Sequence, residues 1–117
     1  MKAVIIKGNS KFVEGNPLAD SFYESLGEFF TSLGYEVSFD AGEPYTEPEV
    51  VDLWIGHSRG VDRLRFAPTG TKIIALGVEG GINHPEDISL SAGQIPNEFH
   101  YMLTEDMKNE IRRMLGR

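Results

Sequence analysis

The stretch "DLWIGHSRGVDRLRFA", residues 52–67, decides the fold that we expect for this chain. It begins with the apolar run Leu53–Ile55, which is typical of a buried strand. A glycine-rich turn follows at Gly56–Gly60, and the residues after it predict a helix from about Ser58 until Pro68 ends it. A buried strand that leads through a short turn into a helix is the repeating unit of parallel sheets.

The rest of the sequence repeats this alternation of short β-branched runs and helical periods. One helix is predicted from Pro17 to Leu33 and another from a cap at Thr104 to the end of the chain. The apolar residues of the first helix fall on one face: Leu18, Phe22, Leu26, Phe29, Phe30 and Leu33. The remaining strands are predicted at Ala3–Ile6, Tyr35–Phe39, Lys72–Leu76 and, as a last short strand, Phe99–Leu103. The pattern predicts an α/β fold, a three-layer α/β/α sandwich with a mostly parallel sheet, in a single domain over residues 1–117.

The composition limits the classes of function. The chain has 117 residues, of which 40% are hydrophobic and 25% charged, as is ordinary for one globular domain. Its net charge of −7 argues against nucleic acid as a partner, because a phosphate backbone is bound by a surplus of cations. The absence of cysteine excludes disulfides, thiolate metal sites and cysteine nucleophiles. No segment has the roughly 20 apolar residues of a bilayer span, so we expect no membrane contact and a cytoplasmic location.

The turn at Gly56–Gly60 fits the pattern G-x-S-x-G, with Ser58 at its centre. In this pattern a sharp turn between strand and helix lifts the serine above the sheet, and the flanking glycines let neighbouring backbone pass close. The amide of Arg59, at the start of the helix, then faces the oxyanion that develops during acyl transfer. The position of the pattern, after an apolar strand and before a helix, favours Ser58 as a nucleophile.

With these motifs the chain resembles the α/β-hydrolase superfamily. The stretch "DLWIGHSRG" looks like the family's nucleophile strand and elbow, and "VIIKGNS" like the strand and loop that supply the second oxyanion-hole amide. The end of the chain, "FHYMLTEDMKNEIRRML", resembles the family's closing element. The resemblance implies a truncated, lidless serine hydrolase that acts on a small-molecule ester, thioester or amide substrate without a cofactor or metal. It implies no oligomeric state.

The resemblance also implies the roles of individual residues. His100 would be the general base and Glu79 or Asp87 the carboxylate that orients it, in the family's order of serine, acid and histidine. His57 is expected to have a structural role at the elbow, and His84 to lie on the surface. Four residues are implied to bind the substrate or its oxyanion: Gly8, Asn9, Ser10 and Arg59.

Two other functions stay open. Residues 8–37, "GNSKFVEGNPLADSFYESLGEFFTSLGYEV", resemble the opening of flavodoxin-like proteins, in which a Ser- and Asn-rich loop leads to a phosphate-binding helix N-terminus. "GHSRGVDRL" would then be a phosphate-binding loop beside Arg59 and Arg63, and the chain a nucleotide- or flavin-binding domain, although it lacks G-x-G-x-x-G and a Walker lysine. The other alternative is a catalytically inactive hydrolase-like protein that serves as an interaction module.

Overall fold

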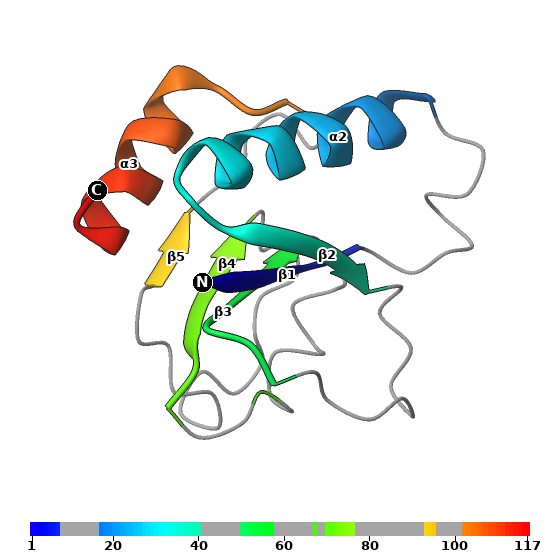
Figure 1. Cartoon of the computed structure of the whole chain (residues 1–117). Helices are drawn as coiled ribbons and strands as arrows, with labels where there is room; N and C mark the ends of the chain where they lie inside the picture. Colours follow the sequence, from blue (N-terminus) through cyan, green and yellow to red (C-terminus); the bar gives the residue numbers. More distant parts are fainter. Residues whose placement is uncertain (8–16, 41–49, 58–66, 68–69, 77–92, 96–101) are drawn as a thin grey trace.

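In a computed structural model of the chain (Figure 1), one sheet and two helices are described. The described residues are 1–7, 17–40, 50–57, 67, 70–76, 93–95 (without their side chains) and 102–117. The strands are β1 (Lys2–Ile6), β2 (Glu36–Asp40), β3 (Leu53–His57), β4 (Lys72–Leu76) and β5 (Gly93–Ile95). The described helices are α2 (Pro17–Ser32) and α3 (Glu105–Leu115).

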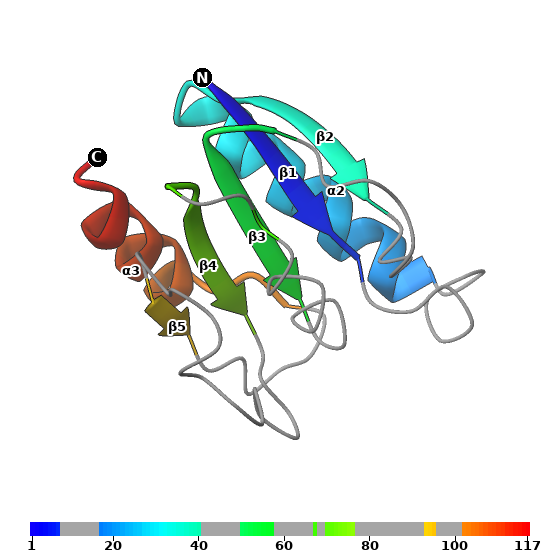
Figure 2. The ribbon, with the colours of Figure 1, turned by 90° about the horizontal axis from the view of Figure 1, so that it is seen from below.

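All neighbouring strands of the sheet are parallel, in the order β2-β1-β3-β4-β5. Figure 2 shows the strands as arrows that point the same way. The register aligns the carboxyl ends of the strands, since Ile6 pairs with both Asp40 and Gly56, and His57 pairs with Leu76. This order is that of flavodoxin-like sheets, in which the chain runs outward in both directions from the boundary between β1 and β3.

Both faces of the sheet are buried at strands β1, β3 and β4. Side chains alternate between the two faces of a strand, so Ala3 and Ile5 belong to one core cluster and Val4 and Ile6 to the other. Trp54, 1% exposed, is the largest side chain of the second cluster. Near-continuous apolar strands covered on both faces are typical of parallel sheets. The predicted fold class is therefore confirmed: an α/β protein with a parallel sheet, consistent with a three-layer α/β/α sandwich.

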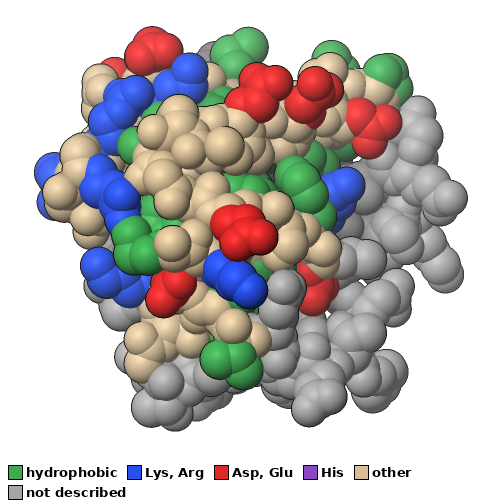
Figure 3. All heavy atoms as spheres, viewed as in Figure 1, with side chains coloured by type: hydrophobic (Ala, Val, Ile, Leu, Met, Phe, Trp, Pro, Cys, Tyr) green, Lys and Arg blue, Asp and Glu red, His purple; other side chains and the backbone are tan. Residues whose placement is uncertain are grey.

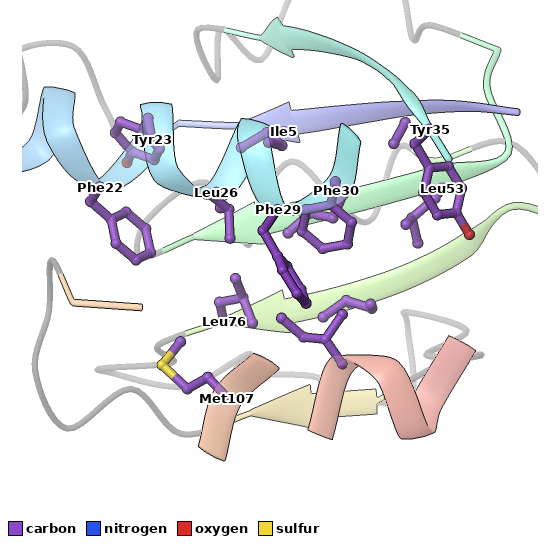
Figure 4. Close-up of a cluster of buried hydrophobic side chains, with 14 of the residues drawn as sticks. Ile5, Phe22, Tyr23, Leu26, Phe29, Phe30, Tyr35, Leu53, Leu76 and Met107 are labelled. Carbon is purple, nitrogen blue, oxygen red and sulfur yellow. The ribbon is translucent and has the colours of Figure 1, made fainter. Parts of the chain in front are cut away.

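Helix α2 covers the first face of the sheet with an aromatic stripe. Figure 4 shows Phe22, Leu26 and Phe30 directed from α2 toward the strands. These positions were predicted from their helical spacing and are buried. Leu18, predicted for the same face, is instead 68% exposed, and the buried residue of the first turn of α2 is its neighbour Ala19.

Helix α3 lies beside α2 on the same face (Figures 1 and 2). The predicted cap is confirmed, since the Thr104 hydroxyl accepts a hydrogen bond of 3.2 Å from the amide of Met107. Gly116 ends the helix with a φ of 68°, in the left-handed region where glycine has no steric penalty. The guanidinium of Arg112 lies 5.1 Å from the ring centroid of Phe29, which joins the two helices.

The other predicted elements were confirmed in part. Strands β1 to β4 lie within a residue or two of the predicted ranges, whereas β5 falls between the predicted strands Lys72–Leu76 and Phe99–Leu103, where no strand was predicted. The predicted last strand was wrong at Met102 and Leu103, which are not in a strand, and its residues 99–101 lie outside the described ranges. The predicted helix after Ser58 also lies outside them. Neither helix described here is long and apolar enough to span a membrane.

Candidate ligand site at the carboxyl edge of the sheet

The boundary between β1 and β3 is the place in this sheet where a ligand site is expected. Connections that leave two adjacent parallel strands toward opposite sides open a crevice beyond their carboxyl ends. Lys7 follows β1 directly, and its amide donates to the carbonyl of Asp40 at 2.9 Å, continuing the β1–β2 ladder. His57 is the last residue of β3. These two side chains and the adjoining face of α2 form the candidate site.

His57 is completely buried and held from α2. The Tyr23 hydroxyl and the Nδ1 atom of His57 form a hydrogen bond of 3.0 Å, in which the hydroxyl donates when Nδ1 carries no proton. The ring of Phe22 lies 4.5 Å from the imidazole centroid, and that of Tyr23 stands nearly perpendicular to it at 5.4 Å. Because a buried histidine needs polar partners, this pair fixes the imidazole beneath the edge of the sheet. The expected structural role of His57 agrees with this burial.

Lys7 brings a positive charge to the same edge. Its Nζ atom lies 5.4 Å from the ring centroid of Tyr23 and 5.0 Å from that of Phe39, at cation–π distance from both. Across the described ranges, no carboxylate forms an ion pair with Lys7. The half-buried ammonium group therefore lies beyond the carboxyl end of β1, over one ring from α2 and one ring from β2.

The predicted site residues cannot be placed in this geometry. Ser58, His100, Glu79 and Asp87, and the binding residues Gly8, Asn9, Ser10 and Arg59, all lie outside the described ranges. Sequence reasoning did not find the contact of Tyr23 with His57, 34 residues apart. The available signal was His57 itself, a polar residue that ends an apolar strand and needs a partner when buried.

Shifted pKa values are found away from this edge, on the exposed surface of α3. A side-chain hydrogen bond from Arg113 lowers the pKa of the Glu110 carboxyl, and the same contact raises the pKa of Arg113. This pair links positions one turn apart on a helix and is a surface feature. It lies on α3, which follows β5, and not at the edge formed by Lys7 and His57.

Comparison with known proteins gives one structural likeness. No protein-family model and no curated protein matches the sequence. The receiver domain of the sensor histidine kinase PA1611 from Pseudomonas aeruginosa PAO1, solved with a magnesium ion in its active-site cleft, matches with a TM-score of 0.51. The match covers 99% of this chain and 98% of the receiver domain at 15% sequence identity. At that identity the likeness shows a shared fold.

This likeness corrects the expected family. The predicted membership of the α/β-hydrolase superfamily was wrong, and so was the serine hydrolase function with its small-molecule ester or amide substrate, because the fold matched over the whole chain is that of a receiver domain. The physical reason is that a nucleophile elbow needs only a strand, a tight turn and a helix. Every parallel α/β sheet repeats these elements, so the stretch around Ser58 does not select one family among them. The flavodoxin-like alternative agrees better with the structure.

Proposed function

We propose that the chain is a flavodoxin-like binding domain that holds a phosphate-bearing ligand of the nucleotide or flavin class beyond the carboxyl ends of β1 and β3. The observation that supports this proposal is the position of Lys7, a cation without a carboxylate partner in the described ranges, directly after β1, one of the two strands at which the strand order reverses. A lysine ammonium group is a point charge that binds phosphate well.

The neighbouring helix adds to the attraction for an anion. The first turn of α2 lies at the carboxyl edge of the sheet, next to the end of β1, in both views of the fold (Figures 1 and 2). A helix of 16 residues carries a partial positive charge at its N-terminus. The positive end of this helix and the Lys7 ammonium would therefore both attract a phosphate to this edge.

The aromatic rings at the edge suit the planar part of such a ligand. Phe39 is 47% exposed at the end of β2, and the Lys7 ammonium lies over its ring. A nucleobase or isoalloxazine ring can pack against an exposed aromatic face while its phosphate reaches the lysine. The buried pair Tyr23–His57 would position the wall of the site and take no part in chemistry.

A magnesium site like that of the receiver domain is not supported by the residues described here. Mg²⁺ prefers several oxygen ligands in octahedral geometry. No group of three or more His, Asp or Glu residues within the described ranges could hold a metal ion. At the end of β1 the described residue is Lys7, whose charge repels a divalent cation. We therefore derive no metal-dependent step for this chain.

Equilibrium titration with flavin mononucleotide, AMP and inorganic phosphate tests the proposal. The variant Lys7→Met keeps the alkyl chain and removes the charge, and Lys72→Met, at the amino end of β4, is its matched control. We expect Lys7→Met to weaken binding of the phosphate-bearing ligands about tenfold to a hundredfold, the worth of a charge-assisted hydrogen bond. Lys72→Met should bind like the wild type. Equal affinities of both variants, or no binding to the wild type at millimolar ligand, would contradict the proposal.

A further inference from the structure

A groove lies on the outer side of the molecule, between α2 and the edge strand β2. It has a volume of about 510 Å³. Gly27, Val37 and Phe39 give it an apolar side, and Glu24 and Glu28 give it an acidic side. We call this feature the α2–β2 groove.

At Gly27 the backbone of α2 comes close to the ring of Phe39, and both residues line the groove. A Cβ atom at this position would lie 3.0 Å from Cζ of Phe39, closer than side-chain contacts normally come. The ring of Phe39 therefore packs against the bare backbone of α2, with 47% of its surface left exposed. Glycine inside a helix is about 1 kcal/mol less favourable than alanine. The chain thus has, at the centre of this surface, a residue that is less favourable for the helix than alanine.

The acidic side of the groove belongs to a row of carboxylates along α2. Asp20, Glu24 and Glu28 follow one another at intervals of four residues, so they share one face, and all three are exposed. Figure 3 shows acidic side chains gathered over α2, with hydrophobic side chains between them and β2. Like charges at this spacing destabilise a helix. Within the described residues no cation forms an ion pair with Glu24 or Glu28.

We propose that the α2–β2 groove binds a basic amphipathic segment of a partner protein. An apolar side chain of that segment packs against Phe39 and Val37, and a neighbouring Lys or Arg pairs with Glu24 or Glu28. The charge of the groove selects this partner, because cations relieve the repulsion along α2 and the half-exposed ring offers apolar contact.

A second copy of the chain fits this surface poorly. Its net charge is −7, so two copies repel each other. Antiparallel pairing of two β2 strands about Ser38 would also set Glu36 opposite Asp40, and like charges directly opposite one another are destabilising.

The test begins with selection of random dodecapeptides displayed on phage against the immobilised full chain. The selected peptide is then synthesised with a fluorophore, and its affinity is measured by fluorescence anisotropy. The variant Glu24→Gln/Glu28→Gln removes the two groove charges. The matched control, Glu36→Gln/Asp106→Asn, removes two exposed negative charges outside the groove.

We expect the selected peptides to place Lys or Arg beside an apolar residue. Their binding should be about tenfold weaker for the groove variant, the sum of two exposed ion pairs, and unchanged for the control. Selection of no peptide, peptides without basic residues, or equal affinities for the two variants would overturn the proposal. So would a wild-type dimer in sedimentation velocity that the groove variant abolishes, since the occupant would then be a second copy. Lys7 is unchanged in these variants, so a loss of peptide binding reports the groove carboxylates and not the charge of the proposed ligand site, although Phe39 belongs to both surfaces.

Discussion

The hydrogen bond between Tyr23 and His57 can be tested by removing one oxygen atom. The variant Tyr23→Phe keeps the ring and its edge contact with Phe22 at 5.6 Å, and loses only the hydroxyl. Tyr23 is 2% exposed and His57 is fully buried, so water cannot replace the lost bond. A buried polar group that loses its partner costs about 1–3 kcal/mol. Because His57 has a further contact, we expect the lower half of that range, about 1–2 kcal/mol.

Urea unfolding followed by fluorescence measures this loss, since Trp54 is the one tryptophan and lies buried in β3. With a slope of about 2 kcal/mol per molar urea, the middle of the usual range, the midpoint should fall by roughly 0.5–1 M. Tyr35→Phe is the matched control. Tyr35 is also buried, but its hydroxyl forms no hydrogen bond within the described residues, so the midpoint should move by less than about 0.3 M. Equal shifts for the two variants would refute the role given to the Tyr23–His57 bond.

Two other substitutions test local features of the fold. Thr104→Ala removes the cap of α3 and should lower the free energy of unfolding by about 1 kcal/mol, or the melting temperature by about 4 °C. Thr104→Ser keeps the hydroxyl and should retain most of this stability. An unchanged melting temperature for Thr104→Ala would show that the hydroxyl does not cap the helix. Gly27→Ala should raise the free energy of unfolding by up to about 1 kcal/mol, because the half-exposed Phe39 ring can move aside for the new methyl group. A large loss of stability in calorimetry would mean that Phe39 is held rigidly over Gly27.

The local elements of this fold could be predicted because each has a strong signal of its own. The apolar runs that became β1, β3 and β4 are buried on both faces, so their sequences are nearly free of polar residues. Strand β5 was missed because it is only three residues long, and a glycine and a glutamine are two of them. Leu18 was assigned to the buried face from helical spacing, but in the first turn of α2 the next residue, Ala19, is the one that is buried.

The family could not be predicted from the same residues. The stretch around His57 predicts a strand, a turn and a helix, and these local features are common to hydrolase elbows and to flavodoxin-like sheets. Such proteins differ in their tertiary structure, including which side chains lie together at the carboxyl edge of the sheet. Tyr23, Phe39 and Lys7 meet there from α2, β2 and the end of β1, and no spacing along the chain predicts that meeting.

The most direct test of the proposed ligand site asks at which edge of the sheet a phosphate-bearing ligand binds. Flavin mononucleotide is titrated into ¹⁵N-labelled protein, and amide shifts are compared between the two ends of the strands. We predict that the largest changes occur at the carboxyl edge, at Lys7, Asp40 and His57, and that Lys7→Met removes them. Changes centred on the amino edge, at Lys2 and Lys72, or no saturable changes at all, would contradict the proposed site.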